Sequence, residues 1–323
     1  MTKPSLLITR PLPEPVVKAA QEICDVTMED KNQLYTAAEC AEALNTFDAV
    51  LPTLGDGFSA AAFANGSSAR CKLVANFGVG YNHIDVGAAS TCGITVTNTP
   101  GAVTDATADI AMTLILMTAR RAGEGERLVR SGNWHGWHPT QMLGTHIGGK
   151  VLGIIGMGRI GQAVARRAHF GFGMDVVFYN RSRVADCTVP GAQQLDSIAA
   201  VMAASDITSI SVPGSPENHH LIGVDALGAA KSGAILVNTA RGDVIDEKAL
   251  IEALNLGTLA GAGLDVYEHE PKVPAALLAM ENVVLLPHLG TNSLEVRTQM
   301  GLMAVENIRV FFAGKVPPNK VNA

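Results

Sequence analysis

The chain has 323 residues and a mass of 33.7 kDa, enough for about two domains whose cores need no disulfide or metal. Apolar residues make up 47% of the chain and charged residues 17%, which excludes an intrinsically disordered protein. The formal net charge is -6 and no basic run is present, so we expect no nucleic-acid partner.

The chain shows no targeting or membrane segment. Near the amino terminus only Leu6 to Ile8 are consecutively apolar, too few for a secretory signal. The longest apolar run, Ile110 to Met117, is interrupted by Thr113 and is far shorter than the roughly 20 residues of a bilayer span. The five cysteines are widely spaced and form no C-x-x-C pair, which favours reduced thiols. We therefore expect a cytoplasmic protein with no membrane partner.

Two series of short apolar segments, separated by helical patterns, follow each other along the chain. The first series predicts strands at Ser5–Thr9, Ala49–Leu51, Lys72–Phe77 and Ile94–Asn98, with helices at Pro11–Glu22 and Ala37–Leu44. The second series predicts strands at Val151–Ile155, Val176–Tyr179, Ile207–Val212, Ala234–Asn238, Gly261–Asp265 and Val283–Leu286. Strands that are apolar on both faces and alternate with helices indicate parallel sheets covered on both sides. The prediction is an α/β fold with two doubly wound, Rossmann-like parallel-sheet domains and a cleft between them.

Two long helices are predicted outside these series. Thr104–Arg121 has helical spacing and follows the breaker cluster at 98–101, which we interpret as a hinge. Near the carboxyl terminus, Asn292 and Glu295 have the spacing of a capping box. This box would open a helix whose apolar face comprises Val296, Met300, Ala304, Ile308 and Phe311.

A glycine-rich turn follows the first strand of the second series. The strand leads directly into Gly156-x-Gly158-x-x-Gly161, and a helix comes next, which is the context of a dinucleotide-binding loop. Gly156 permits the tight turn, Gly158 lets the backbone approach a pyrophosphate, and Gly161 allows close packing of helix on strand. A tight turn without a ligand is the alternative, and the strand-turn-helix context disfavours it.

The end of the next strand bears on which dinucleotide is bound. NAD-binding proteins carry an acid about 20 residues after the glycines, where it accepts the ribose hydroxyls. Here Asn180 stands at that position and is followed by Arg181 and Ser182, which would bind a 2′-phosphate. We therefore expect NADP(H) to be preferred, with NAD(H) possible. The alternative is that Arg181 and Arg183 are ordinary surface charges.

Three later segments place polar groups just beyond predicted strands. They are AILVNTARGD with Arg241, LDVYEHEP with Asp265 and Glu270, and VVLLPHLG with His288. Ligands of open α/β sheets bind at the carboxyl ends of the strands, so these groups would meet near the glycine loop. An arginine, an acid and a histidine suffice to bind a 2-oxo acid and protonate its ketone. Each residue alone has a structural alternative, as an ion-pair partner, a loop acid or a capped loop histidine.

Other candidate sites are weaker. The loop Gly78-Val79-Gly80 follows a predicted strand and could hold a small carboxylate on its N–H groups, but it lacks a third glycine. His135 and His138 flank Trp137, and His219 is adjacent to His220. No further Cys or His lies near either pair at zinc-ligand spacing, so no metal site is expected.

The motifs together resemble those of the D-isomer-specific 2-hydroxyacid dehydrogenase family over nearly the whole chain. The matching segments are GVGYNHID (78–85), VTNTPG (96–101), TDATADIAMTLIL (104–116), GIIGMGRIGQ (153–162), VNTARGDVID (237–246), GAGLDVYEHEP (261–271) and VVLLPHLG (283–290). YNRSR (179–183), TDATAD and GNWHGWHP (132–139) are most similar to the glyoxylate/hydroxypyruvate reductases. The segment at 281–288 is also similar to that of hydroxyphenylpyruvate reductases.

The resemblance implies the roles of the catalytic residues. His288 would protonate the developing alkoxide, Glu270 would orient the imidazole, and Arg241 would bind the substrate carboxylate and polarise the carbonyl. The N–H groups of Val79 and Gly80 would hold the same carboxylate from the other lobe.

The resemblance also implies a set of cofactor contacts. The phosphates, the adenosine and its ribose, and the nicotinamide of the cofactor would be bound by one set of residues. This set comprises Gly156, Gly158, Gly161, Thr107, Arg159, Ile160, Asn180, Arg181, Ser182, Val212, Pro213, Asn218, Thr239, Ala240, Arg241, Asp265, His288 and Gly290. The family commonly has Thr where Asn218 stands, which makes that contact the least secure.

The layout implied by the family gives residues 1–99 and 289–323 to a substrate-binding domain and residues 100–288 to a dinucleotide-binding domain. The implied function is reduction of small 2-oxo acids, such as glyoxylate and hydroxypyruvate, to D-2-hydroxy acids by an NADP(H)-preferring enzyme. Alternatives are reduction of bulkier 2-oxo acids such as phenylpyruvates, or a nicotinamide-sensing regulatory protein. Family members are usually dimers, often through the helix at 104–121, so a homodimer is expected.

Overall fold

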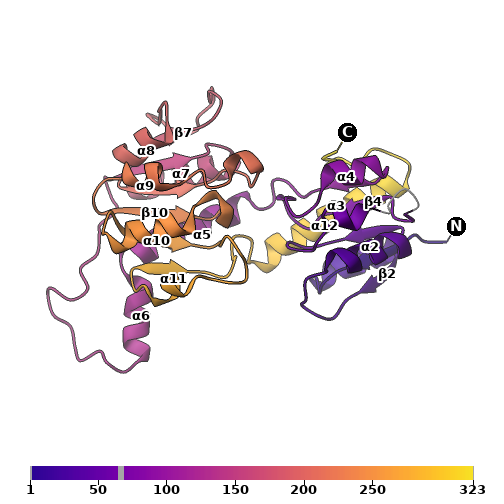
Figure 1. Ribbon diagram of the computed structural model, residues 1–323, viewed down its shortest axis with the longest axis horizontal. Helices are drawn as coiled ribbons and strands as arrows, with labels where there is room; N and C mark the ends of the chain where they lie inside the picture. Colours follow the sequence, from indigo (N-terminus) through magenta and orange to yellow (C-terminus); the bar gives the residue numbers. More distant parts are fainter. Residues whose placement is uncertain (1, 65–68, 323) are drawn as a thin grey trace. The chain divides into compact units, whose positions relative to one another are not determined.

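The computed structural model describes residues 2–64 and 69–322, and the chain forms two compact units (Figure 1). One unit comprises residues 1–103 and 292–323, and the other comprises residues 104–291. These boundaries lie a few residues after the predicted divisions at 99/100 and 288/289. The substrate and dinucleotide roles assigned to the two parts stay predictions.

The first unit is built on a five-stranded parallel sheet of order β2-β1-β3-β4-β5. The strands are β1 (Ser5–Ile8), β2 (Asp25–Met28), β3 (Ala49–Leu51), β4 (Leu73–Ala75) and β5 (Thr95–Thr97). Four of these lie within predicted strands, but β2 was not predicted. It is an edge strand whose residues are mostly exposed, so it carries no apolar run that a sequence pattern could reveal.

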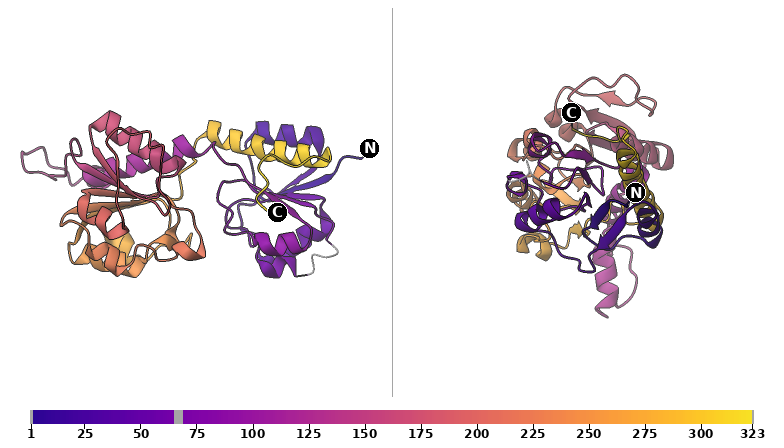
Figure 2. Two further views of the ribbon diagram at one scale, coloured as in Figure 1. Left: turned by 90° about the horizontal axis from the view of Figure 1, so that it is seen from above. Right: turned by 90° about the vertical axis from the view of Figure 1, so that its right-hand side faces the viewer.

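Helices cover both faces of this first sheet (Figure 2). α1 (Glu14–Ile23) and α12 (Leu294–Phe312) pack on one face, and α2 (Ala37–Thr46), α3 (Ala60–Phe63) and α4 (Val86–Thr91) on the other. α12 buries Met300, Ala304 and Ile308 of its predicted apolar face.

The predicted capping box of α12 is wrong by one residue. Ser293 is the N-cap, and its hydroxyl accepts the Val296 N–H at 3.3 Å. Asn292 and Ser293 are both good capping residues, so the sequence could not decide between them. Because the helix starts after Ser293, Glu295 falls one position too early to complete a box with the cap.

The second unit is built on a seven-stranded parallel sheet of order β12-β11-β10-β9-β6-β7-β8. The strands are β6 (Val151–Ile155), β7 (Asp175–Tyr179), β8 (Gln193–Gln194), β9 (Ile207–Ile210), β10 (Ala234–Asn238), β11 (Leu259–Leu264) and β12 (Val283–Leu285). Six were predicted, whereas β8 consists of two glutamines and has no apolar pattern. The predicted doubly wound, parallel α/β architecture is confirmed in both units.

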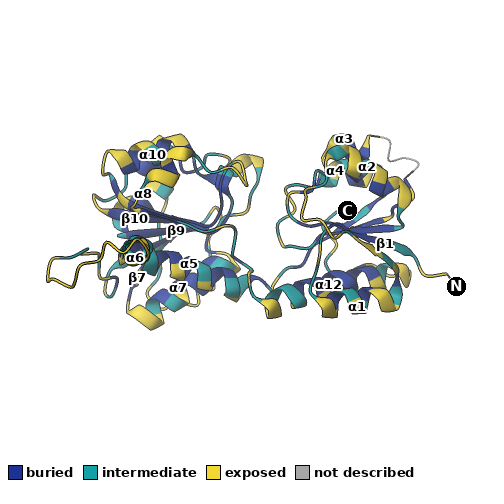
Figure 3. Cartoon of the chain, turned by 90° about the horizontal axis from the view of Figure 1, so that it is seen from below, coloured by how far each residue is buried: buried dark blue, intermediate teal, exposed yellow. Residues whose placement is uncertain are grey.

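Helices also cover both faces of the second sheet, and the strands between them are buried (Figure 3). The helices of this unit are α5 (Thr104–Ala119), α6 (Ala122–Arg130), α7 (Arg159–Phe172), α8 (Ile198–Ala204), α9 (Val224–Gly228), α10 (Glu247–Asn255) and α11 (Ala275–Ala279). α5 and α7 lie on one face, and α8, α9 and α10 on the other. Within residues 2–64 and 69–322, no helix is both long and apolar enough to cross a membrane.

The helix predicted at Thr104–Arg121 ends two residues early. α5 stops at Ala119, and Arg121 adopts a left-handed backbone with φ of 53°. α6 then begins in a new direction and contains no buried residue. Leu128 of this helix is only partly buried and Val129 is 59% exposed, so part of its apolar surface faces solvent.

Candidate active site

The carboxyl ends of six strands of the second sheet lie at one level. Ile155 at the end of β6 pairs with Tyr179 of β7 and Ile210 of β9. Asn238 at the end of β10 pairs with the same Ile210 and with Leu264 of β11, and Leu264 pairs in turn with Leu285 of β12. The loops at this edge therefore begin at Gly156, Asn180, Ser211, Thr239, Asp265 and Leu286. The glycine loop and the polar segments that the sequence places directly after strands of this unit all start here, as expected for the ligand edge of a parallel sheet.

The glycine loop leaves space for a ligand at one of its three glycines. A Cβ on Gly156 would lie 2.7 Å from the Ser211 oxygen, and a Cβ on Gly161 would lie 2.2 Å from the Gly156 oxygen. The protein itself therefore requires these two glycines. A Cβ on Gly158 would meet nothing within 4 Å. Gly158 is also the N-cap of α7 and offers no side-chain cap to the free N–H groups of Arg159 and its neighbours.

Buried hydroxyls next to this loop support a ligand as well. Among the described residues, the hydroxyls of Ser211 and Thr239 are buried without any hydrogen-bond partner. Both residues follow strands at the same edge, one on β9 and one on β10. Unpaired buried hydroxyls and an open helix N-terminus fit the polar groups and phosphates of a dinucleotide.

The loop after β7 is held by its own side chains. The Asn180 amide donates to the Ser182 carbonyl at 3.0 Å and lies 3.3 Å from its hydroxyl, while Gln194 donates to the carbonyls of both residues. Arg181 is exposed. The Ser215 hydroxyl and the Glu217 N–H lower the pKa of the Glu217 carboxyl, and the charge of Arg181 adds to this effect. Arg181 is thus within electrostatic reach of one acid.

Other residues predicted to touch the cofactor make internal contacts. Asn218 donates its amide to the Pro213 carbonyl at 2.9 Å and so shapes the loop after β9. The Thr107 hydroxyl donates to the Gly290 carbonyl at 3.1 Å and ties α5 to the turn after β12. These contacts explain how the loops hold their shape, and the predicted cofactor contacts stay predictions.

His288 and Glu270 form the pair that the sequence predicted. Nδ1 of His288 lies 2.9 Å from Oε2 of Glu270, and Oε1 accepts the Tyr267 N–H at 3.1 Å. Burial alone would raise the pKa of Glu270, but the hydrogen bond and charge of His288, the Tyr267 N–H and the Arg241 charge hold it below its usual range. Within the described chain no hydrogen bond to Nε2 of His288 is found. Nε2 is therefore the ring nitrogen available for proton transfer.

Asp265 organises the backbone on which His288 sits. Its carbonyl accepts the His288 N–H at 2.9 Å, and its carboxylate accepts the N–H groups of Leu289 at 2.6 Å and Gly290 at 2.8 Å. His288 has a φ of 55°, a left-handed conformation that is costly for a non-glycine residue. Burial raises the pKa of Asp265, against the opposing effect of these hydrogen bonds. A buried carboxylate thus fixes an unfavourable turn, as is common at functional sites.

Arg241 lies on a loop that packs tightly against the Glu270 loop. A Cβ on Gly242 would lie 1.8 Å from the Tyr267 carbonyl carbon, so the two loops touch backbone to backbone. A Cβ on Gly214 would lie 2.8 Å from Cγ of Arg241, so that glycine makes room for the arginine stem. Burial lowers the pKa of the Arg241 guanidinium, and the charges of Glu270 and Asp243 oppose this shift. The structure therefore brings Arg241, Glu270 and His288 into one electrostatic cluster.

Sequence reasoning missed the residues that hold this cluster together. Gly214, Gly242 and Tyr267 matter because of their close contacts, and the Tyr267 hydroxyl donates to the Leu286 carbonyl at 2.9 Å. A glycine directly after a candidate catalytic arginine was the one available signal. The contact partners could not be identified before the loops were placed in space.

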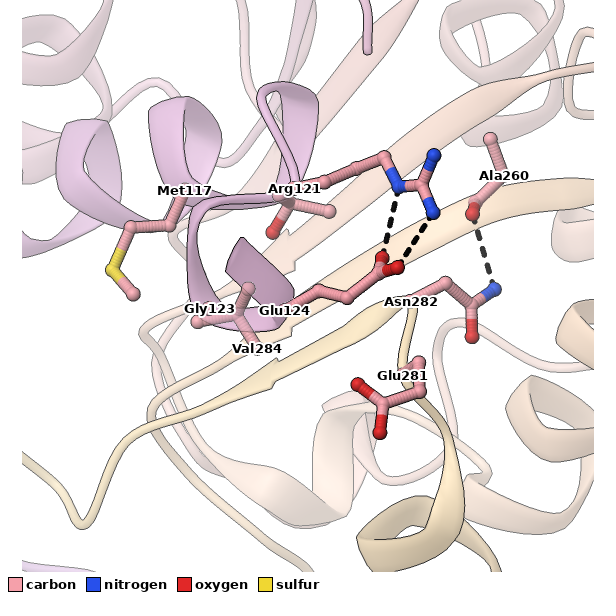
Figure 4. A pocket seen from close by; sticks show the side chains of 9 residues that line it. Met117, Arg121, Gly123, Glu124, Ala260, Glu281, Asn282 and Val284 are labelled. Carbon is pink, nitrogen blue, oxygen red and sulfur yellow. Dashed lines mark hydrogen bonds and ion pairs between the residues drawn. The ribbon is translucent and has the colours of Figure 1, made fainter. Parts of the chain in front are cut away.

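A cavity elsewhere in the second unit is unrelated to this cluster. It has a volume of about 370 Å³ and is lined by Met117, Thr118, Arg121, Gly123, Glu124, Ala260, Glu281, Asn282 and Val284 (Figure 4). Ala260 and Asn282 lie at the amino ends of β11 and β12, which is the opposite edge of the sheet from His288. The Arg121–Glu124 ion pair of 2.6 Å forms part of its wall.

Comparison with known proteins identifies the family of this chain. The family model of the D-isomer specific 2-hydroxyacid dehydrogenase NAD-binding domain matches residues 112–290. A glyoxylate reductase from Thermococcus litoralis is 41% identical over 99% of this chain and 97% of its own length.

Two solved structures are similar over almost their whole length. One, from a Polaromonas species and described as an NAD-binding D-isomer specific 2-hydroxyacid dehydrogenase, has a TM-score of 0.92 and 35% identity, covering 99% of this chain and 100% of its own. The other is the NADPH-dependent glyoxylate/hydroxypyruvate reductase of Sinorhizobium meliloti in complex with NADP and malonate. It has a TM-score of 0.87 and 32% identity, covering 99% of this chain and 97% of its own. The chain therefore belongs to the D-isomer-specific 2-hydroxyacid dehydrogenases, a family of nicotinamide-dependent oxidoreductases.

Proposed function

We propose that this protein reduces small 2-oxo acids, glyoxylate and hydroxypyruvate in the first place, to D-2-hydroxy acids, and that it prefers NADPH to NADH. The observation that carries the proposal is the 2.9 Å contact between His288 and Glu270 in one cluster with Arg241. The names of the glyoxylate reductase and glyoxylate/hydroxypyruvate reductase relatives support the choice of substrate.

His288 is the proposed proton donor. Glu270 holds Nδ1, so the imidazolium can give the proton on Nε2 to the carbonyl oxygen as that oxygen becomes an alkoxide. Asp265 fixes the backbone of the same residue, which sets where Nε2 lies. When bound, the reduced nicotinamide supplies the hydride that the carbonyl carbon receives.

Arg241 is the proposed substrate-binding cation. A guanidinium offers a planar fork of donors that matches a carboxylate, and its permanent charge polarises the neighbouring carbonyl. Burial works against the charge of this half-buried side chain, and the negative charges of Glu270 and Asp243 favour it. The loop Gly78–Gly80 of the first unit is proposed to bind the substrate carboxylate through the N–H groups of Val79 and Gly80.

The test of the substrate is a panel of glyoxylate, hydroxypyruvate, pyruvate and phenylpyruvate, with loss of NADPH absorbance as the readout. We expect the highest kcat/KM with glyoxylate or hydroxypyruvate. Highest activity with phenylpyruvate would instead identify a reductase of bulky 2-oxo acids. Tight NADPH binding without turnover on any of the four would favour a nicotinamide-sensing regulatory protein.

The proposed NADPH preference rests on the loop after β7. Asn180 replaces the acid that would repel a 2′-phosphate, and Arg181 and Ser182 can bind one. A charge-assisted hydrogen bond contributes about 1.5–3 kcal/mol, and exposure of Arg181 and the nearby Glu217 reduce this, so we expect a preference of about tenfold.

The cofactor test compares kcat/KM for NADPH and NADH at one 2-oxo acid concentration. The double change Asn180→Asp with Arg181→Ala should reverse the order, because the new carboxylate repels phosphate and accepts ribose hydroxyls. The matched control is Arg183→Ala, which removes a neighbouring exposed arginine of the same loop. Equal values for the two cofactors in the unmodified protein would mean that Arg181 does not contact the phosphate.

We also propose that the protein is a cytoplasmic homodimer. α6 has no buried residue, and the segment after it exposes Trp134, Trp137 and Leu143 to 50%, 78% and 66%. Large apolar side chains clustered on one segment are typical of a protein–protein contact. All five cysteines are free thiols, which suits a reducing compartment.

A further inference from the structure

The loop Gly78–Gly80 has every one of its carbonyl oxygens bound by the first unit itself. The Gly78 oxygen accepts the Asn76 amide at 3.0 Å and the Thr99 N–H at 3.0 Å. The Gly80 oxygen also accepts a hydrogen bond from the Asn76 amide, at 3.0 Å. The Val79 oxygen accepts the Asn98 amide at 2.9 Å. Two asparagines therefore hold three successive carbonyls.

Two N–H groups of this loop, unlike its carbonyl oxygens, are left without a hydrogen-bond partner in the described part of the chain. Among the residues described, neither the Val79 nor the Gly80 N–H makes a hydrogen bond. In a trans peptide the C=O and the following N–H point in opposite directions within one plane. Turning the Gly78 oxygen toward Asn76 therefore turns the Val79 N–H away from Asn76. In the same way, the bond from Asn98 to the Val79 oxygen turns the Gly80 N–H away from Asn98.

Both asparagines are themselves rigidly placed. Asn76 is 1% exposed, and its backbone N–H donates to the Thr97 carbonyl at 2.9 Å. Asn98 is 9% exposed, and its backbone is bound on both sides, by the Asn319 carbonyl and by the buried Asn307 amide of α12. Burial and these backbone bonds hold the two residues in place, and from there their amides orient the peptide planes that they contact.

We propose that Asn76 and Asn98 are positioning residues for substrate binding, which orient the peptide planes 78–79 and 79–80 so that the Val79 and Gly80 N–H groups are presented to the substrate carboxylate. This inference rests on the proposed function of the loop. The donor to these carbonyls is in each case the side-chain amide nitrogen. An aspartate carboxylate of the same shape would place an oxygen against these carbonyl oxygens. Because the two oxygens repel each other, the peptide planes would rotate away.

The decisive variants are Asn76→Asp and Asn98→Asp, which keep the side-chain shape and remove the donor. We expect KM for glyoxylate and Ki for oxalate, an unreactive dicarboxylate, to rise about tenfold or more, with kcat changed much less. The Kd of NADPH should stay at the wild-type value, because the cofactor loop belongs to the other unit. Asn76→Ser separates positioning from charge repulsion, since it is neutral and a hydroxyl can donate to only one carbonyl at a time. It should raise KM and Ki in the same direction.

The matched control is Asn322→Asp. Asn322 also donates its amide to a backbone carbonyl of the first unit, that of Ile94 at 2.8 Å, but it does not touch the loop. It should lower thermal stability and leave KM and Ki unchanged. Wild-type KM and Ki in Asn76→Ser would overturn the inference, whether or not the aspartate variants fold. Absence of 2-oxo acid reduction by the unmodified protein would refute the proposed function instead, and oxalate binding would still report on the loop.

Discussion

His288 is held by two carboxylates that act on different parts of it. Glu270 contacts the imidazole, and Asp265 binds the backbone N–H groups of the turn that carries it. The first contact sets the tautomer of the ring, whereas the second stabilises the left-handed backbone. The proposed proton donation therefore depends on the strand ends of both β11 and β12.

Replacing His288 should remove most of the turnover. We expect His288→Ala to lower kcat for 2-oxo acid reduction by about 100-fold or more, the usual contribution of a general acid. The Kd of NADPH, measured by fluorescence titration, should change little. The matched control is His269→Ala, which removes an exposed histidine from the Glu270 loop. Wild-type kcat in His288→Ala would show that another group donates the proton.

The pKa of Glu270 links this pair to stability. Its folded-state pKa is lowered, so its contribution to the free energy of unfolding is fully present above its unfolded pKa of 4.5 and is lost as pH falls through the folded value. The stability difference between wild type and Glu270→Gln should therefore shrink as pH is lowered from 6 to below 4.5. Urea unfolding at several pH values measures it. A difference that is constant with pH would contradict the ion pair.

Arg241 should not tolerate lysine. Lysine is a point charge without the planar fork of donors, so one charge-assisted hydrogen bond to the substrate carboxylate is lost. The expected cost is about 1.5–3 kcal/mol, or about 10- to 150-fold in kcat/KM for glyoxylate. Arg166→Lys on the exposed side of α7 is the control. A kcat/KM near the wild-type value would show that Arg241 does not bind the carboxylate as a fork.

At the scale of the elements, the active cluster depends on two loops in backbone contact. The turn Gly242–Val244 after β10 lies against Tyr267 and Glu268 after β11, with no space for a side chain at Gly242. The Glu268 N–H also donates to the Glu247 carboxylate at the start of α10, at 3.0 Å. The loops that carry Arg241 and Glu270 are thus held in one arrangement by neighbouring strands.

A methyl group at Gly242 should separate these loops. A Cβ there would meet only backbone atoms, at 1.8 to 2.3 Å, and no flexible side-chain end could move aside. We expect Gly242→Ala to destabilise the protein by about 3 kcal/mol, at the upper end of overpacking costs, and to abolish most turnover. Gly171→Ala in α7 is the control, because a Cβ there meets nothing and alanine favours the helix. Unchanged melting temperature and activity in Gly242→Ala would refute the close contact.

At the scale of the whole molecule, α6 and the exposed segment 131–144 after it contribute no buried residue to the core of the second unit. No residue of α6 is buried, although the helix contacts α5 and its Arg127 pairs with Glu281. An exposed tryptophan pair on such a segment would be costly for a monomer in water. A second copy of the chain is the partner that we propose for this surface.

The oligomeric state tests this surface directly. Trp137→Glu should convert a dimer into a monomer in sedimentation velocity experiments, because it puts a charge at an apolar contact. Leu256→Glu is the control, since Leu256 is 74% exposed at the end of α10 and far from α6 in sequence. A wild-type monomer, or a dimer that survives Trp137→Glu, would exclude this contact.

The sequence by itself determined the features that local patterns encode. Strands that are apolar on both faces predicted the parallel sheets, and the position of each polar residue directly after a strand predicted the shared edge. The glycine loop, Arg241, Glu270 and His288 could be found in this way because their signal lies within a few residues. The edge strands β2 and β8 lack an apolar run, so no pattern revealed them.

Only the tertiary structure decided how these residues are held. The decisive contacts join different segments or cross turns. They are Gly242 against Tyr267, Asp265 against the backbone of residues 288–290, and Asn76 and Asn98 against residues 78–80. Such contacts depend on the three-dimensional placement of backbone carbonyls and N–H groups, which nearly every residue carries, so a local sequence pattern does not identify the partners. For this reason the chemical groups were predictable, whereas the residues that position them were not.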